Sequence, residues 1–426
     1  MRKFTQILGL FFSSLPVVSW AWADQTDFAA LREETFEAAW SQVGASYYDS
    51  TFGGLDWDEV GDRYRAKLPT AESMDQVRAL ISSMIYELGD SHLALISSDY
   101  DPEEIMKPWS GGAAGVEACY AGDRIVFYRV DPKGAAYEAG LRNGDILLAV
   151  DGERVKDFRR SLEKTGQPEH VLKYSLITAL LSRLRTEAGE KVKLLVRSPR
   201  GKKRLLTVEL KRYEGRSTEP LGRMGRMPLG LEATLREDGV AYLRFNLWFP
   251  AVMPEVRAFV GSLPAETSGL VIDLRGNPGG MMVMAGGLAG LVLQEQAELG
   301  RTTLRSGHVN VVGFPQKDAF AGKAAILVDE TSVSTSEVFA IGLQELGRAR
   351  VFGQPTPGAA LPSVFFALPN GDSLQIALGD FKTPNGVSLE ARGVIPDEVV
   401  SVSPVELSAG KDTVLSAALN WIHQPN

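Results

Sequence analysis

The second half of the chain, from about residue 240, most constrains the fold, because short apolar runs alternate there with helical stretches. Apolar strands are predicted at 240–245, 269–274 and 324–328, and helical stretches at 256–263, 281–293 and 336–346. Strands separated by helices of this length are typical of crossover units, which place the strands in one sheet with helices against it. The sequence therefore predicts an α/β layer in this part of the chain.

The segments before residue 230 have a different texture, which indicates further domains. Apolar side chains recur at helical spacing over 26–95, whereas short apolar runs cut by glycine indicate strands and turns over 111–213. A polar, helical insertion is predicted at 156–186, and 214–229 is predicted to be a linker. The expected division is a signal segment (1–23), a helical N-terminal domain (24–110), a β-rich domain (111–213) and the α/β core (214–426).

Residues 1–23 have the pattern of a secretory signal. A basic start precedes an apolar stretch at 7–18, and Ala21 and Ala23 place small residues at the positions that define a cleavage site. The apolar stretch is shorter than a membrane-spanning helix requires. We therefore expect a mature protein that begins at Asp24, is exported, has no membrane span after signal cleavage, and fits a bacterial periplasm.

Composition excludes several kinds of partner and site. The net charge of -8 argues against a nucleic-acid partner, because phosphate binding requires a clustered basic face. A basic run at 197–212 alternates with leucine and valine, as on the exposed face of a hairpin. The single cysteine, Cys119, excludes an internal disulfide, and the four histidines are scattered. No metal and no cofactor is expected.

Three short segments, far apart in the sequence, carry the residues that could do chemistry. They are GDSHL at 89–93, VIDLRGNPGG at 271–280 and ILVDETSVSTSE at 326–337. Each alone has an ordinary structural explanation. Ser334 and Glu337 have the spacing of a capping box before an apolar helix, His92 would be a loop histidine, and the glycines would form a tight connection.

Together the segments supply the parts of an acyl-transfer site. A serine at a helix N-terminus, such as Ser334, gains from the oriented amides there, but its hydroxyl still needs a base. Of the four histidines, His92 is the best placed, because the others lie in the polar insertion, near the C-terminus or outside any motif. Gly279 and Gly280 allow the backbone to turn amides toward an oxyanion.

These residues carry a family resemblance. DLRGNPGG (273–280) and SVSTSE (332–337), with the later GRARVFGQPTPG and LEARGVIPD, closely resemble the tail-specific (carboxyl-terminal processing) serine peptidases and their tricorn-core relatives. The segment 111–213, with AGLRNGDILLAVDG, resembles a PDZ domain. Over nearly the whole mature chain, the resemblance implies an α/β and α+β multidomain fold: a helical N-terminal segment, a PDZ-like domain and a crotonase/Clp-like α/β catalytic core. It also implies a peptide-binding PDZ strand at Gly115, Val116 and Glu117.

The sequence departs from the Ser-Lys branch of that family. The nucleophile there is the middle serine of Ser-x-Ser-x-Ser-Glu, here Ser334, but the lysine of Pro-Thr-x-Gly-Lys-Gly is replaced by Ala359. A dyad of that design is therefore absent. Lys382 is a rival base with nothing around it to support the role, and Glu345, where Ser-Lys relatives carry an acid, is interpreted as a solvated helix glutamate.

The tricorn-like branch fits better. Its site resembles a Ser-His pair, a serine nucleophile and a glutamate before Gly-Val-x-Pro-Asp, and this sequence has Ser91-His92, Ser334 and Glu390. The resemblance implies that Ser334 attacks the carbonyl and that neutral His92 takes its proton and later returns it. Ser91, hydrogen-bonded to Glu390, would orient the imidazole.

Two assignments within the site depend on position alone. The oxyanion hole is expected from the amides of Thr335 and of Gly279 or Gly280. Ser332 and Ser336 are rival nucleophiles, and only their place in the motif separates them from the middle serine.

The leading functional hypothesis is an exported serine endopeptidase whose PDZ domain recruits or gates peptide or unfolded, tail-exposed protein substrates. PDZ domains bind extended chain ends by adding a strand to a sheet edge. The alternative is a catalytically degenerate PDZ-containing peptide-binding protein, for which Ala359 is the main support. An esterase-like or lipophilic-ligand-binding variant of the same fold is disfavoured because the PDZ segment indicates peptides.

Overall fold

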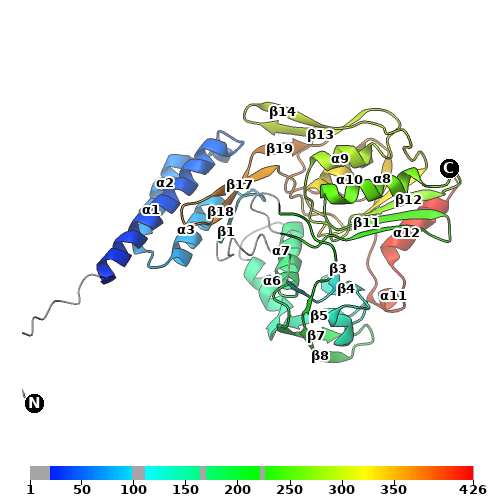
Figure 1. Cartoon of the computed structure of the whole chain (residues 1–426), viewed down its shortest axis with the longest axis horizontal. Helices are drawn as coiled ribbons and strands as arrows, with labels where there is room; N and C mark the ends of the chain where they lie inside the picture. The colour runs from blue at the N-terminus through cyan, green and yellow to red at the C-terminus, as the bar shows by residue number, and fades with distance from the viewer. Residues whose placement is uncertain (1–19, 98–110, 164–168, 221–225, 426) are drawn as a thin grey trace, which may run out of the picture.

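The computed structural model describes residues 20–97, 111–163, 169–220 and 226–425 (Figure 1). A helical N-terminal unit, a β-rich unit and a larger α/β unit lie side by side in it (Figure 1). The predicted signal falls outside the described residues up to position 19, and the described chain starts as a helix at Trp20. None of the helices in the described ranges has both the length and the apolar character that crossing a membrane requires.

The N-terminal unit is helical, which confirms the prediction for this segment. Its helices are α1 (Trp20–Ser46), α2 (Trp57–Arg65) and α3 (Met74–Tyr86), with short 3-10 helices η1 (Phe52–Gly54) and η2 (Leu68–Thr70). Asp56 caps α2, and Ser73 caps α3 by accepting a hydrogen bond from the amide of Gln76. These caps explain where the helices begin.

A distant hairpin completes this unit. Strand β18 lies between β1 and β17 in a three-stranded sheet; the bounds are β1 (Ala94–Ile96), β17 (Ser363–Ala367) and β18 (Ser373–Ala377). Apolar side chains of β18, such as Leu374 and Ile376, share one core with Phe36 of α1 and Ile81 of α3. The hairpin therefore belongs with the N-terminal helices in space, although it comes from the 214–426 segment.

The β-rich unit is a PDZ domain in architecture. Its main sheet has the order β3-β4-β5-β7-β8, with β6 paired to β5 and β2 to β9. The strands are β2 (Gly112–Ala113), β3 (Val116–Ala121), β4 (Arg124–Val130), β5 (Ile146–Val150), β6 (Glu153–Arg154), β7 (Lys191–Arg197), β8 (Lys203–Glu209) and β9 (Lys211–Arg212). The helices are α5 (Ala135–Glu138), α6 (Val155–Glu163) and α7 (Glu169–Ser182).

The insertion predicted at 156–186 is helical but is not a polar appendage. Leu172, Leu176, Ile177 and Leu180 of α7 are buried in the same core as the strands. This i, i+4, i+5, i+8 spacing is that of an apolar helix face. The prediction of a polar insertion was wrong for α7, because polar residues at both ends of the helix outweighed its apolar stripe.

The α/β unit confirms the predicted α/β layer. Its sheet has the order β10-β11-β12-β15-β16-β20, antiparallel only between β10 and β11. The strands are β10 (Leu231–Leu235), β11 (Val240–Phe245), β12 (Gly269–Asp273), β15 (Lys323–Val328), β16 (Ala349–Gly353) and β20 (Glu398–Val399). The helices are η3 (Pro250–Val252), α8 (Met253–Gly261), α9 (Val283–Ala289), α10 (Thr335–Glu345), α11 (Pro404–Ser408) and α12 (Thr413–His423).

Alternate strand residues face opposite helix layers. Ile272 of β12 packs in the core that holds α8, α9 and α10, whereas its neighbour Val271 packs against α12. Both faces of this sheet are covered, as parallel sheets require. A second sheet of order β14-β13-β19 lies over α9 and α10; its strands are β13 (Ala297–Leu304), β14 (Gly307–Gly313) and β19 (Gly379–Lys382).

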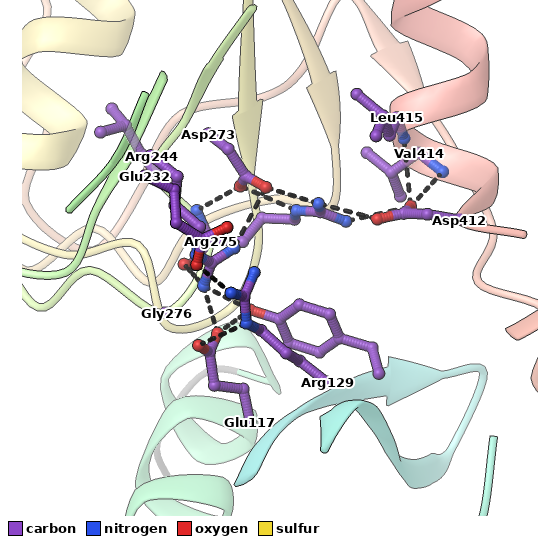
Figure 2. A network of polar contacts seen from close by, with 12 residues as sticks. Glu117, Arg129, Glu232, Arg244, Asp273, Arg275, Gly276, Asp412, Val414 and Leu415 are labelled. Carbon is purple, nitrogen blue, oxygen red and sulfur yellow. Dashed lines mark hydrogen bonds and ion pairs between the residues drawn. The ribbon is translucent and has the colours of Figure 1, made fainter. Parts of the chain in front are cut away.

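A buried ionic network joins the PDZ domain to the α/β unit (Figure 2). Arg244 of β11 contacts Glu117 of β3 and binds Asp273 Oδ2 at 3.1 Å. Arg275 binds Asp273 at 2.6 Å and Asp412 at 2.8 Å. Burial alone would raise the pKa of Asp273, but the two guanidiniums hold it well below its usual range. Removing one partner of this network would leave a buried charge unpaired at the junction between the two units, which is strongly destabilising.

Candidate active site

Ser334 lies where the central strand β15 turns into helix α10, at the carboxyl end of the parallel strands. It has φ 58° and ψ -118°, in the positive-φ region that non-glycine residues rarely adopt. Such strain persists only where the surroundings impose it, and it is concentrated at functional sites. Ser334 is partly exposed, so its hydroxyl is accessible.

The predicted capping box is present at the start of α10. Its glutamate half is a hydrogen bond of 2.9 Å from the Ser334 amide to Glu337 Oε2.

The two rival serines are committed to structural hydrogen bonds. Ser332 is fully buried, accepts from the Asp329 amide and donates to Leu274 O at 2.8 Å. Ser336 is also fully buried, accepts from Trp248 Nε1 at 2.8 Å and donates to a backbone carbonyl at 3.1 Å. The geometry thus favours the middle serine of the motif, which the sequence could separate only by position.

The glycine turn after β12 lies directly against Ser334. A Cβ built on Gly279 would come within 2.7 Å of Ser334 Cβ and 3.1 Å of the Thr335 amide nitrogen. Gly279 has φ 97° and Gly280 has φ 140°, and both values are accessible chiefly to glycine. The turn brings the expected oxyanion donors beside the candidate nucleophile.

The structure distinguishes the two glycine amides. The Gly279 amide donates to Asn277 Oδ1 at 3.0 Å, so it is already used. Among the described residues we find no acceptor for the amides of Gly280 and Thr335. Of the predicted donors, Gly280 and Thr335 thus remain available, and Gly279 does not offer its amide in this arrangement.

Asn277 and Trp248 hold the glycine turn in place by hydrogen bonds, a role that the sequence analysis did not predict. Asn277 is fully buried, donates to Phe245 O at 2.8 Å, and its carbonyl accepts from the Val333 amide at 3.1 Å. Trp248 pairs with the glycine turn, donating its amide to Gly279 O at 2.9 Å. The only sequence signal was the asparagine in the glycine-rich turn.

The predicted Ser-His pair and its glutamate meet at the end of the N-terminal unit. Ser91 Oγ lies 2.8 Å from His92 Nδ1, and the Ser91 amide donates to Glu390 Oε1 at 2.9 Å. Glu390 Oε2 accepts from the Ala360 amide at 3.3 Å. Residues 91, 92 and 390 are therefore brought together, with both the amide and the side chain of Ser91 hydrogen-bonded to Glu390.

The segment 356–360 connects this cluster to Ser334. Glu337 is fully buried and its carboxyl accepts from Thr356 Oγ1 at 2.5 Å and from the amides of Gly358 and Ala359 at 2.7 and 3.0 Å. The next amide, that of Ala360, reaches Glu390. The sequence treated Glu337 only as a cap, so this wider role was missed.

Burial shapes the titration of the site. It lowers the pKa of His92 to about 4, which favours the neutral imidazole that a general base must have. It raises the pKa of Glu390 to about 7, against the opposing hydrogen bonds from Ser91 and Ala360. It also raises the pKa of Glu337 to about 7 despite four hydrogen bonds to the carboxyl.

Other predicted residues have different places. Lys382 is exposed on β19, and the Glu345 carboxyl accepts from the Asn385 amide at 2.9 Å. In the described part of the chain, no hydrogen bond joins Ser334 to His92 directly. No cluster of three or more metal-ligating side chains exists among the residues that the structure describes.

Two of the three residues predicted to bind peptide in the PDZ domain, Gly115 and Glu117, make hydrogen bonds or ion pairs within the protein. Gly115 carbonyl accepts from the Asp131 amide at 2.9 Å, and Val116 begins the edge strand β3. The Glu117 side chain contacts Arg244 and accepts from Tyr128 Oη at 2.5 Å. Its carboxylate therefore takes part in the junction between the PDZ domain and the core.

A PDZ domain beside an α/β core, with an accessible serine at a strand-to-helix turn, defines a PDZ-containing serine hydrolase. Family models agree with each part. Residues 239–400 match peptidase family S41, residues 28–86 the tricorn protease C1 domain, and residues 126–168 a PDZ domain. The α/β part of the chain thus matches peptidase family S41, and the protein is a serine-type peptidase.

Curated relatives extend over most of the chain. A carboxyl-terminal-processing protease of Picosynechococcus sp. is 27% identical over 91% of this chain and 88% of its own length. A protein of the same description from Synechocystis sp. is 24% identical over 90% of this chain and 85% of its own length.

Solved structures share the fold. A photosystem II D1 C-terminal processing protease superposes with a TM-score of 0.59 at 21% identity, over 88% of this chain and 93% of that one. Mature CPAF complexed with lactacystin superposes with a TM-score of 0.63 at 15% identity, over 92% of this chain and 98% of that one.

Proposed function

We propose that this peptidase is an exported endopeptidase that cleaves peptides or unfolded, tail-exposed proteins through an acyl-enzyme at Ser334. His92 is the general base, supported by Ser91 and Glu390. One observation carries the proposal: hydrogen bonds run from the Ser334 amide through Glu337, Ala359, Ala360 and Glu390 to the Ser91-His92 pair.

The chemistry follows from the groups present. Ser334 Oγ attacks the peptide carbonyl while neutral His92 accepts the hydroxyl proton through Nε2, because Nδ1 faces Ser91. The carbonyl oxygen becomes an oxyanion that the amides of Gly280 and Thr335 stabilise. His92 then protonates the leaving amine, and a water molecule hydrolyses the ester by the same proton path. Hydrogen bonds of catalytic groups often form fully only with substrate bound, which fits the indirect link seen here.

The PDZ domain supports a gated route to this site. β3 lies at the edge of its sheet, where a peptide could add as a strand. Yet Cys119, Tyr120 and Ala121 of β3 are buried beside α7 and the core. Peptide addition therefore requires this edge to be uncovered. The names of the relatives favour carboxyl-terminal ends as the substrates, and the signal pattern at 1–23 favours export to a periplasm.

A catalytically degenerate peptide-binding protein is the second candidate, and Ala359 is the observation in its favour. At the position of the Ser-Lys lysine it supplies only an amide, to Glu337. This candidate predicts peptide binding without an activated serine.

A fluorophosphonate probe separates the two. We expect the mature chain (24–426) to be phosphonylated at Ser334, as mapped by mass spectrometry, and Ser334→Ala to lose the label. His92→Ala should slow labelling by about 10³-fold or more. The control His308→Ala, at an exposed residue of β14, should leave it unchanged. A folded protein that binds peptide but takes no label would establish the binding function instead, and labelling that His92→Ala does not slow would refute the base assignment.

A further inference from the structure

We propose that the hydrogen bond between Tyr47 and Asp90 anchors the Ser91-His92 turn and makes both of them positioning residues for the proposed base. The inference rests on the proposed function of His92. Neither residue touches the reacting atoms. Their effect would pass through the position of the imidazole.

The turn that carries His92 is short and held from two sides. It connects the end of α3 to β1, and Gly89 at its start has φ 76°. On one side the Tyr47 hydroxyl donates to Asp90 Oδ2, and on the other the Ser91 amide donates to Glu390 Oε1 at 2.9 Å. Two adjacent residues are thus tied to opposite neighbours. The direction in which His92 leaves the backbone depends on both ties.

Tyr47 is itself a fixed point. It follows α1 directly, is 3% exposed, and its ring stacks on Phe52 at 5.9 Å between centroids. Phe52 stacks in turn on Trp57 at 5.4 Å. The neighbouring amide, that of Tyr48, donates to Ala377 O on β18 at 3.3 Å. An aromatic stack and a strand therefore locate the hydroxyl that holds Asp90.

The surroundings of Asp90 make this hydrogen bond necessary. Burial raises the pKa of Asp90, the Tyr47 hydroxyl opposes that rise, and the nearby Asp380 and Asp49 carboxyls add to it. The Tyr48 hydroxyl is a second hydrogen-bond partner of Asp90, and the Glu390 carboxyl also faces it. Without the Tyr47 hydroxyl, the partly buried carboxyl would keep only the Tyr48 hydroxyl against several like charges, so we expect it to shift and to move the turn with it.

The test compares two tyrosines of the same helical unit. Tyr47→Phe removes the hydroxyl bound to Asp90, and the control Tyr64→Phe removes a hydroxyl bound to Glu87 Oε1 at 2.8 Å, at the C-cap of α3 and outside the Ser91-His92 turn. We expect Tyr47→Phe to slow phosphonylation of Ser334 about tenfold or more, since small displacements of catalytic groups cost that much. Tyr64→Phe should change it less than about twofold, with similar melting temperatures for both variants.

Two further variants distinguish positioning from a general effect on folding. Asp90→Asn keeps an oxygen that accepts from Tyr47 and should retain the rate within about threefold, whereas Asp90→Ala should match Tyr47→Phe. In a His92→Ala background, Tyr47→Phe should cause no further loss, because its effect passes through the imidazole.

Equal rates for Tyr47→Phe and Tyr64→Phe, or additive losses in the His92→Ala background, would overturn the anchor while leaving the proposed function in place. A His92→Ala variant that labels normally would overturn both.

Discussion

Replacing Gly279 with alanine tests whether the glycine turn sets the position of the nucleophile. The new methyl group would lie 2.7 Å from Ser334 Cβ and 2.8 Å from Val333 O, whereas ordinary contact distances are 3.4–4 Å. The turn or Ser334 must therefore move by about 1 Å. A displacement of that size from reaction geometry costs about 10²-fold in rate.

The backbone strain of this substitution needs its own control. Gly279 has φ 97°, so alanine there is strained by about 1 kcal/mol regardless of contacts. Gly347, just after α10, has φ 66° and open space around its position, so Gly347→Ala carries strain without a collision. We would measure the labelling rate of Ser334 and the melting temperature of both variants. If Gly279→Ala labels as fast as Gly347→Ala, the turn does not define the site and the reasoning from the close approach is wrong.

Two buried groups give further predictions. The Glu337 carboxyl accepts four hydrogen bonds, two on each oxygen, so Glu337→Gln would place an amide NH₂ against two donors. We expect it to lower the free energy of unfolding by about 2 kcal/mol more than the control Glu345→Gln, as measured by urea denaturation. Because burial lowers the pKa of His92 to about 4, its stabilisation is complete above the unfolded pKa of about 6.5 and is lost as the pH falls toward 4. Glu390 has the opposite effect on stability. Because its pKa is raised to about 7, its contribution to the free energy of unfolding is lost as the pH rises through 7. His92→Gln should remove the rise in unfolding free energy that His92 contributes between pH 4 and 6.5, so the variant's stability should increase less, or fall more, with rising pH than that of the parent; an identical slope in both proteins would contradict the buried neutral imidazole.

Local spacing was enough to predict the α/β layer and the strand-to-helix turn at Ser334. Alternating apolar runs identify strands and helices, and a Ser-x-x-Glu pair before an apolar stretch identifies a helix start. These patterns depend only on residues that are close together in the chain, so a single sequence is enough to recognise them. Glu337 shows the limit: the spacing located the helix terminus but did not show that the same carboxyl also accepts from three groups of the segment 356–359.

The remaining features depend on contacts between distant segments. Nothing local to Leu374 or Ile376 indicates that they pack beside Phe36 of α1. Likewise nothing in the sequence around Ser336 shows that its hydroxyl is occupied, because its hydrogen-bond partners, Trp248 and Asn277, come from distant segments. Contacts of this kind depend on how distant segments are arranged in the fold, and the periodicity of apolar residues does not predict them.

The missing lysine is the sharpest case, because the same segment that lacks it holds the proposed site together. Ala359 donates its amide to Glu337, which fixes Ser334, and Ala360 donates its amide to Glu390, which fixes Ser91. Main-chain groups make these contacts, so side-chain identity at 359 is free to change without breaking the connection. The hairpin β17–β18 follows this segment directly and packs against the N-terminal helices. It therefore brings the N-terminal unit, which carries the proposed base His92, next to the segment that contacts Ser334. The position that argues against catalysis in the sequence is therefore, in the structure, part of the path that links His92 to Ser334.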